Sequence, residues 1–534
     1  SRRAARPSDP PPFPAPRAPP RAMGSAPQSK GAAPLEGEEL SRVFRLPEGA
    51  WIVTSNRYAP DALSGHRPWA GSPAEASPER GPRGAGAGPE ADRAAGCLLG
   101  LAVGDALGAP LEFHPVRYPG GPPREGEPPR AGLLPELWED TSDLRETNRF
   151  LLRMGQWTDD TAMALCLADS LLANGGFHPR DVRLRFLAWW MLGYNNAFGK
   201  DKAHRDKVWG NAGSVGLGGI IGESISEFAR LPADYTRTGS ATSSGNGSIM
   251  RNAPVAIMYR HDVGLAMQAA WRQSRTTHRG EEAADCARLL TWICVRAITM
   301  GAGKAVLEDL TGFPAQLYST RCLADARAES RHEDNAGLDL AERDWRWRGD
   351  CFHYAPLRAS ADPGYAGSYC MDCLAMALHC VHVTATFRDA VLRAANLCGD
   401  ADTVAAVTGQ IAGAIYGASA IPAGWLQAVE KWDDGDIRLR AWLLFAADPP
   451  SEPSLHEQED NSSWAELRSS DNCTEIWTKL RGAALPPFEE TPVEKTDAAP
   501  SGPKPFVCGC GRTFGSPQIL KCHSRKCAKA SAGS

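Results

Sequence analysis

The sequence predicts an all-α fold for the larger part of its 534 residues. Apolar residues recur at helical spacing in successive segments, and Leu, Ala and Trp dominate these segments. Runs of alternating β-branched residues, which are typical of strands, are missing between them. With 43% hydrophobic and 23% charged residues, the chain has enough apolar side chains to fill a large helical core.

Composition divides the chain into four parts. Residues 1–90 are mostly rich in Pro, Arg, Gly and Ala and are expected to be disordered, whereas 91–448 carry the helical patterns. Residues 449–503 are polar and Pro-rich, as linkers are, and 504–530 hold a small Cys-rich unit. The first 34 residues have the Arg-rich, acid-poor bias of an organellar leader, but their prolines oppose an amphipathic helix, so disorder is the expectation.

The first helical pattern begins near Ala91 and is rich in glycine. Gly96, Gly100, Gly104 and Gly108 are four residues apart and therefore lie along one helical face. Each glycine costs a helix roughly 1 kcal/mol relative to Ala, so close approach of another helix or of a ligand must compensate.

Nine further helical patterns follow, with residues 114–150 and 311–368 expected to be long irregular connections. The patterns cover Thr161–Ala173, Pro179–Gly193, Ile220–Ala229, Val263–Thr276, Glu281–Met300, Tyr369–His382, Phe387–Asn396, Thr403–Tyr416 and Trp425–Lys431.

Charge and cysteine content restrict the class of function. A net charge of -5 favours neither a nucleic-acid surface nor a membrane surface as the main partner. The 15 cysteines are scattered, as in a reduced intracellular protein of the cytoplasm or nucleus, and we expect a monomer. The uncharged stretch from Thr403 to Val429 could cross a bilayer by length, but its glycines and polar residues favour a packed helix, so no membrane partner is expected.

Two acidic clusters stand at the beginnings of predicted helices, TDDT at 158–161 and DADT at 400–403. Asp and Thr are common N-caps, and a carboxylate there gains ~0.3–1 kcal/mol from the helix dipole, so capping alone explains either cluster. However, each cluster has one acid more than capping needs. Carboxylate and hydroxyl oxygens are the ligands that Mg²⁺ or Mn²⁺ prefers, and four gathered carboxylates stay ionised only beside cations, as in two-metal sites.

Five segments, in chain order, resemble the ADP-ribosylglycohydrolase family: GLAVGDALGAPLEF, QWTDDTAMAL, GNGSIMRNAPVAI, THRGEEA and GDADTVAAVTGQIAGAIYG. This family includes the dinitrogenase-reductase-activating glycohydrolases and the ADP-ribosyl-acceptor hydrolases. The resemblance covers about Ala91–Asp448. It implies a compact helical domain around a binuclear centre of two Mg²⁺ or Mn²⁺ ions.

The resemblance also implies roles for the acidic residues. Glu112 matches a Glu that approaches the metals or their water, and Asp105, on the same predicted helix face, is expected to support the ligands. Cys398 stands where the family often has Gly. The catalytic carboxylate is expected among Glu112, Asp159 and Asp402. The implied metal ligands are Thr158, Asp159, Asp160, Asp400, Asp402 and Thr403.

A flexible loop, GNGS, precedes a helix that we expect to begin near Ile249. Composition alone favours a plain helix-entry turn, but in the family this loop faces ADP-ribose, with backbone N–H groups turned toward an anion. Arg251 is expected to form a buried structural ion pair, with contact to a substrate phosphate as the alternative. Tyr369 either stacks on the substrate or packs in the core. The implied substrate-binding residues are Gly245, Asn246, Gly247, Ser248, His278 and Tyr365, the last with core packing as an equal alternative.

The implied reaction is hydrolysis of the glycosidic bond between ADP-ribose and an acceptor, on an ADP-ribosylated protein or a small ADP-ribose derivative. The acceptor (Arg, Ser, a polymer end or an O-acyl group) is left open. The alternative is a catalytically inactive structural or ADP-ribose-binding relative that is recruited by its C-terminal unit. The complete ligand set favours the enzyme.

The C-terminal unit resembles a ββα zinc finger of a Cys-Cys-His-Cys variant. Its expected Zn²⁺ ligands are Cys508, Cys510, His523 and Cys527, although Cys-x-Cys replaces the usual Cys-x2-Cys and Cys522 is a possible substitute. A disordered basic tail is the alternative. A single finger would dock to a protein or to nucleic acid.

Overall fold

The computed structural model describes the helical body and one short hairpin near the C-terminus. Its contacts divide the chain into two units, Ser1–Gly482 and Ala483–Ser534. The described residues are 88–117, 141–146, 150–201, 204, 214–230, 233–328, 343–349, 352, 359, 362–447, 449, 506–507 and 513–514.

The described part of the first unit is helical, which confirms the predicted fold class. Its α-helices are α3 (Pro89–Gly108), α4 (Asp159–Asn174), α5 (Pro179–Leu192), α7 (Gly219–Arg230), α8 (Ala253–Met258), α9 (Val263–Arg275), α10 (Glu281–Met300), α11 (Tyr318–Ala324), α13 (Cys370–Val383), α14 (Phe387–Asn396), α15 (Ala401–Tyr416), α16 (Ala423–Glu430) and α17 (Asp436–Ala446). Short 3-10 helices are η1 (Ala109–Leu111), η3 (Gly199–Asp201), η4 (Asn246–Ser248), η5 (Gly303–Leu307), η8 (Pro363–Tyr365) and η9 (Ala418–Ala420).

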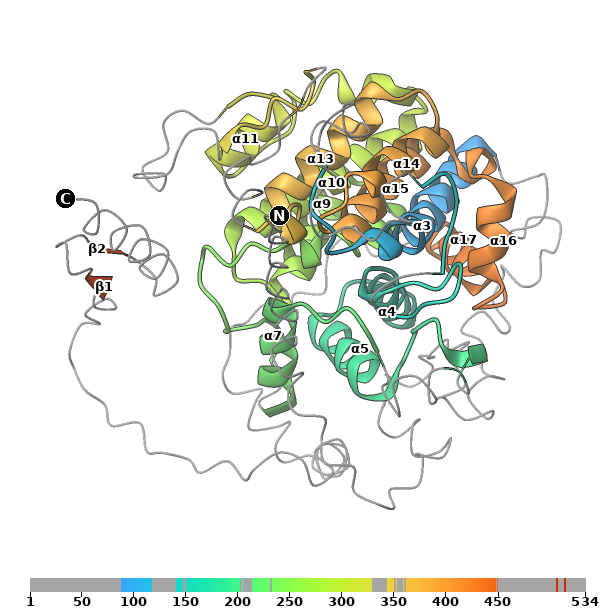
Figure 1. Cartoon of the computed structure of the whole chain (residues 1–534), viewed down its shortest axis with the longest axis horizontal. Coiled ribbons are helices and arrows are strands. Elements are labelled where there is room, and N and C mark those ends of the chain that lie inside the picture. The colour runs from blue at the N-terminus through green and yellow to red at the C-terminus, as the bar shows by residue number, and fades with distance from the viewer. Residues whose placement is uncertain are drawn as a thin grey trace, which may run out of the picture. The chain divides into compact units, whose positions relative to one another are not determined.

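Helix α3 lies at the centre of this body (Figure 1). It packs against α15 along its length and also contacts α4, α8, α10, α14 and α17. Every residue from Gly96 to Gly108 is buried. Because α3 is covered on all sides, its sequence is apolar around its whole circumference rather than on one stripe.

The glycines of α3 form a seam with α15. An added Cβ at Gly96 would lie 2.4 Å from the Gly413 carbonyl oxygen, and one at Gly100 would lie 2.2 Å from that of Gly409. Further along, the Gly104 position would meet the Ala405 oxygen at 2.1 Å. Residue numbers fall along α15 as they rise along α3, so the two helices are antiparallel, and their backbones are in contact. The close approach expected from the glycine spacing is therefore that of another helix.

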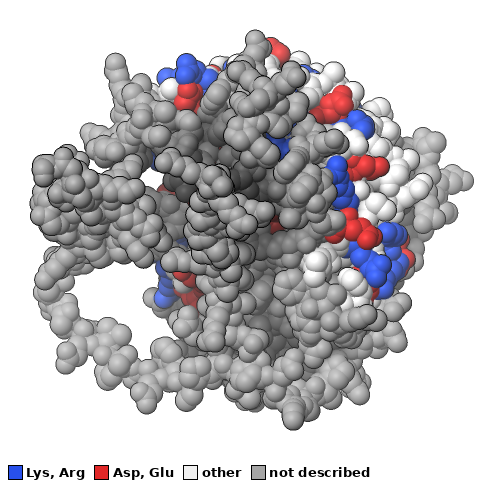
Figure 2. Space-filling model, in the orientation of Figure 1, with Lys and Arg blue, Asp and Glu red and all other residues white. Residues whose placement is uncertain are grey.

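The stretch between Thr403 and Val429 is divided among α15, η9 and α16, and most of α15 is buried, in agreement with the expected packed helix. One described helix, Pro89–Leu111, is long and apolar enough to cross a membrane, and 94% of its apolar window is buried inside the body. On the face shown in Figure 2, the described basic and acidic side chains lie intermixed.

All ten predicted helical patterns correspond to described helices, but α11 and α17 were missed and one expected helix begins later than predicted. A helix expected near Ile249 begins instead at Ala253, after η4, because Pro254 fits the first turn of a helix. The connection predicted at 311–368 contains α11, and the amides of Gln316 and Leu317, just before this helix, donate to the Asp285 carboxylate of α10 at 3.0 Å. A contact between segments so far apart in the sequence leaves no local signal. Helix α17 was also not predicted.

The described part of the second unit is a pair of two-residue strands, β1 (Phe506–Val507) and β2 (Thr513–Phe514). They are antiparallel, with Phe506 opposite Phe514. The expected zinc ligands Cys508, Cys510, His523 and Cys527 lie outside the described residues, so the zinc finger stays a prediction.

The seam predicts that Gly104→Ala destabilises the body. The new methyl group would collide with the α15 backbone, and such overpacking costs about 1–3 kcal/mol of unfolding free energy. Gly424→Ala in α16 is the matched control, because nothing lies within 4 Å of its added Cβ, and it should be neutral or slightly stabilising. Denaturant unfolding of both variants checks this, and equal midpoints would contradict a tight seam.

Candidate active site

The two acidic clusters come together at one end of the α3–α15 pair. Thr158 and Asp400 occupy the N-cap positions of α4 and α15, and the other acids lie in the first turns. In the described part of the chain, neither N-cap side chain accepts a capping hydrogen bond, whereas Asp262 and Thr386 do so at other helices. Capping therefore does not explain these acids.

A sharp turn at Cys398 and Gly399 places Asp400 at the cluster. Cys398 and Gly399 both have left-handed backbone, with φ of 61° and 69°, a conformation that glycine adopts more readily than cysteine does. The Gly399 amide donates to the His114 carbonyl at 2.8 Å, and Gly399 in turn accepts from the Phe113 amide at 2.8 Å. These bonds hold the segment that follows Glu112 beside Asp400.

Asp105 links α3 to the first cluster. One carboxylate oxygen accepts from the Thr158 amide and hydroxyl, both at 2.9 Å. The other accepts from the Thr161 amide at 3.0 Å and from its hydroxyl at 2.6 Å. Since donors occupy both oxygens, Asp105 supports the cluster, as expected, rather than offering a free ligand atom.

The carboxylates are close enough to share a cation. One oxygen from each of Asp105, Asp160 and Asp402 lies within 4.8 Å of the others, and the same holds for Glu112, Asp400 and Asp402. Apart from Asp105, whose oxygens already accept hydrogen bonds, these acidic groups could hold a metal ion. Asp159 lies in the same first turn as Asp160.

Two observations indicate that the donor set fits a divalent ion. The Thr158 hydroxyl lies 2.9 Å from Asp105, 3.1 Å from Asp402 and 3.4 Å from Asp160, although its one proton can serve only one of them. In addition, Asp160 Oδ1 and Glu112 Oε2 are buried without a hydrogen-bond partner among the residues that the structure describes. Unpaired buried oxygens are costly, and a bound cation would satisfy them.

Burial and mutual repulsion disfavour ionisation of the whole cluster. Burial raises the pKa of Asp160 well above its ordinary value, and the carboxylates of Asp402, Asp105, Asp159 and Asp400 raise it further. The pKa of Glu112 is raised well above normal by burial and then by Asp402, Asp400 and Asp159. Without cations, the cluster therefore holds protons.

Gly216 lies against the Asp159 side chain. Gly216 has φ of +90°, and a Cβ there would lie 2.0 Å from Asp159 Oδ1. Only glycine combines this backbone with so close an approach. This role of Gly216 could not be predicted from sequence, because a Gly in a short Gly-rich segment before a helix carries no separate signal.

In the loop at 245–248, one side chain points toward the acidic cluster and another points into the core. The Asn246 amide donates to Asp400 Oδ2 at 3.0 Å and to the Gly367 carbonyl at 3.1 Å, so this residue reaches the acids. Ser248 is fully buried and hydrogen-bonded to Ser274 at 2.9 Å, so its hydroxyl faces the core. Gly245 and Gly247 leave room for His278, which lies 3.4 and 3.1 Å from their added Cβ atoms.

His278 is buried under this loop, with Nδ1 2.8 Å from the Thr277 hydroxyl. Burial, and secondly Arg251, lower the pKa of His278 to about 3, so its imidazole is neutral at physiological pH. Arg251 is itself fully buried, donates to Gln273 and Thr277, and stacks 4.4 Å from the Phe186 ring centre. These contacts place the Arg251 guanidinium in the core of the helical body.

The two tyrosines differ in position. Tyr365 is 49% exposed, and its ring centre lies 5.1 Å from that of Phe113, the residue after Glu112. The neighbouring Ala366 carbonyl accepts from the Asp400 amide at 2.9 Å, so Tyr365 stands at the rim of the cluster. Tyr369 is instead held by Glu282 and Arg343 at the beginning of α10, which makes it part of the frame.

Known proteins resemble this chain over the helical body. The family model for ADP-ribosylglycohydrolase matches residues 87–459. An ADP-ribosylarginine hydrolase, Tri1, from Pseudomonas putida is 34% identical over 359 residues, which cover 67% of this chain and 79% of that protein. The ADP-ribosyl-[dinitrogen reductase] glycohydrolase of Rhodospirillum rubrum is 29% identical over 356 residues, covering 66% and 96%.

Among solved structures, a chain described as an ADP-ribosylglycohydrolase-related protein complex has 30% sequence identity and a TM-score of 0.48. The similarity covers 67% of this chain and 99% of that one. The family model alone matches more than half of the chain, in the part that carries the acidic cluster. The chain belongs to the ADP-ribosylglycohydrolase family.

Proposed function

We propose that this protein is a metal-dependent hydrolase that releases ADP-ribose from an ADP-ribosylated acceptor. The observation that carries the proposal is the buried group of carboxylates formed by Glu112 and the α4 and α15 N-termini. In the described part of the chain, this group retains two unpartnered oxygens. Such an arrangement is unfavourable in a protein without cations and is suited to holding them.

Two Mg²⁺ or Mn²⁺ ions would be held by the two clusters together. Bound dications polarise hydroxyl groups and lower the pKa of a bound water. Asp105 has its oxygens occupied and would orient Thr158 instead of binding directly. The proposed ligands are Thr158, Asp159, Asp160, Asp400, Asp402 and Thr403.

Glu112 is the proposed general base. Its Oε2 has no hydrogen-bond partner within the described residues and can accept the proton of a water that attacks the anomeric carbon of the distal ribose. As the new C–O bond forms, the bond to the acceptor breaks and the leaving group takes up a proton, which completes the hydrolysis. The group that gives this second proton is left unassigned.

Substrate contacts are proposed from the surrounding elements. In the loop at 245–248, the Asn246 side-chain amide already reaches Asp400 at 3.0 Å. Tyr365, half-exposed at the rim, offers a ring face to a ribose or a base. For the acceptor we propose arginine, because the Pseudomonas relative at 34% identity is an ADP-ribosylarginine hydrolase.

Gly216→Ala should weaken Mn²⁺ binding about tenfold, as loss of ligand-orienting contacts commonly does. The added methyl group would displace the Asp159 carboxylate that lies 2.0 Å from its position. Gly435→Ala is the control: its φ of +83° gives similar backbone strain, but nothing lies within 4 Å. Titration of free Mn²⁺ by electron paramagnetic resonance measures both, and equal affinities would argue against Asp159 as a ligand.

The pH dependence of stability should reverse on metal binding. Burial raises the pKa of Asp160 and Asp402, so the folded protein binds these protons more tightly than the unfolded chain does. This contribution to stability is complete below a pH of about 4, the pKa of an Asp in the unfolded chain, and is lost as the pH rises above it. The metal-free protein should therefore lose stability between pH 4 and neutrality. Mn²⁺ requires the ionised carboxylates, so the increase in melting temperature that it causes should grow over the same range. Thermal melts in chelator and in Mn²⁺ test this, and a metal-induced increase independent of pH would contradict it.

Hydrolysis should depend on the metal and on Glu112. We expect release of ADP-ribose from an ADP-ribosylated arginine peptide with Mg²⁺ or Mn²⁺, and none in excess chelator. Glu112→Gln should lower kcat by ~10²–10⁴, the usual contribution of a general base. Glu308→Gln, at an exposed site, is the control and should keep the parental rate.

Parallel assays of an ADP-ribosylated serine peptide and of O-acetyl-ADP-ribose identify the acceptor. Faster release from either than from arginine would refute the proposed acceptor alone. Full activity of Glu112→Gln would refute the assignment of the base.

A further inference from the structure

The segment that leads into the first acidic cluster is held by side chains. Residues 156–158 belong to no helix or strand. The Gln156 side-chain amide donates to the Ala197 carbonyl and to Asp201, both at 3.2 Å. The buried Trp157 ring donates its N–H to the Asn195 carbonyl at 3.1 Å. Residues 195–201 thus form a support against which this segment rests just before Thr158.

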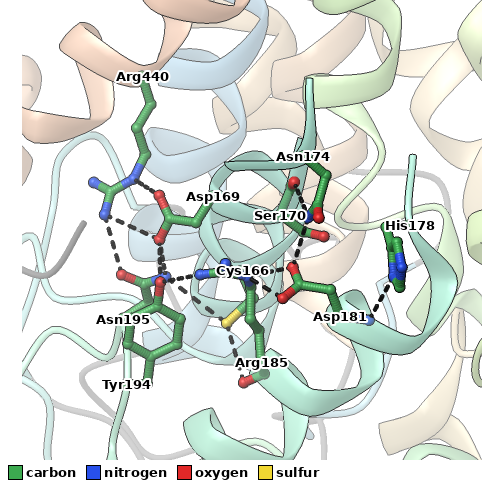
Figure 3. A network of polar contacts seen from close by, with 10 residues as sticks. All are labelled: Cys166, Asp169, Ser170, Asn174, His178, Asp181, Arg185, Tyr194, Asn195 and Arg440. Carbon is green, nitrogen blue, oxygen red and sulfur yellow. Dashed lines mark hydrogen bonds and ion pairs between the residues drawn. The ribbon is translucent and has the colours of Figure 1, made fainter. Parts of the chain in front are cut away.

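Asn195 is itself fixed by a buried ion pair (Figure 3). Arg440 of α17 and Asp169 of α4 have fully buried side chains, with Nε 2.8 Å from Oδ1. The Asn195 side chain joins both: Nδ2 donates to Asp169 Oδ2 at 2.8 Å, and Oδ1 accepts from Arg440 Nη2 at 3.2 Å. The Tyr194 hydroxyl adds a bond to the same Asp169 oxygen at 2.6 Å.

The backbone at Asn195 explains why this residue is suited to the position. Its φ of 62° lies in the left-handed region, which Asn tolerates better than other side chains. This conformation lets one residue turn its amide toward the ion pair and its carbonyl toward the Trp157 ring. A continuous chain of contacts therefore runs from Arg440 and Asp169 through Asn195 and Trp157 to Thr158.

We propose that Trp157 and Asn195 are positioning residues that transmit the rigidity of the buried Arg440–Asp169 pair to the metal-ligand segment at Thr158–Asp160. The inference rests on the proposed metal centre. Metal ligands lose affinity when the groups that orient them are removed, even though those groups do not touch the ion. Neither residue touches the reacting atoms, so the effect is on metal affinity first and on turnover through it.

The chain offers a matched pair of tryptophans for the test. Trp347 is also buried and donates its ring N–H to a backbone carbonyl, that of Leu323 at 2.8 Å, but it lies apart from the acidic cluster. Phe in place of either Trp removes the same hydrogen bond and leaves an aromatic ring. Asn195→Gly tests the next link, because glycine keeps the left-handed backbone but loses both side-chain bonds.

Mn²⁺ affinity of the full chain is measured by electron paramagnetic resonance for the parent and for W157F, W347F and N195G. We expect W157F and N195G to bind about tenfold more weakly than the parent and W347F to bind within about twofold of it. Raising Mn²⁺ to saturation should return the kcat of W157F toward that of the parent, which a damaged fold would not allow.

Equal weakening in W157F and W347F would overturn the proposal, because it would reflect general loss of packing. Parental affinity in N195G would also overturn it, since the ion pair would then have no part in positioning. A parent that binds no Mn²⁺ would instead refute the metal centre and this inference with it. Those outcomes separate the two proposals.

Discussion

Backbone contact between α3 and α15 is the constraint on which the rest of the structure depends. With no side chains between them, the two helices approach until added Cβ atoms would lie 2.1–2.4 Å from carbonyl oxygens. This brings Asp105, near the end of α3, to the beginning of α15 and its acids. Dispersion forces over a long, closely packed seam can hold such a pair despite the poor helix propensity of glycine.

The seam between α3 and α15 also brings the buried carboxylates close enough to repel one another. Several carboxylates are buried beside one another, and their pKa values are raised chiefly by burial. Hydrogen bonds from Thr158 and Thr161 to the Asp105 oxygens hold α3 and α4 together beside these carboxylates. Asp160 and Glu112, in contrast, each retain an oxygen without a partner in the described chain. Within one cluster, Asp105 thus stabilises the packing of the helices, whereas Asp160 and Glu112 keep oxygens available for the proposed chemistry.

Much of this could be predicted from sequence, because helical periodicity and surplus acid at two helix starts are local signals. The seam was expected from the glycine spacing, with its partner left open. By contrast, Gly216 against Asp159 and the Trp157–Asn195 contact depend on segments that meet only in the folded chain. Helix α11 was missed for the same reason, since Asp285 of α10 holds the segment just before it. The inward orientation of Ser248 likewise follows from tertiary packing rather than from its turn-like sequence.

Both oxygens of the Asp105 carboxylate accept hydrogen bonds from Thr158 and Thr161, so an incoming cation need not compete for them. The segments that carry the proposed ligands are therefore positioned before an ion binds. Under the proposed chemistry, a bound ion replaces the protons of the buried carboxylates, so binding stabilises the fold by an amount that grows with the concentration of free metal.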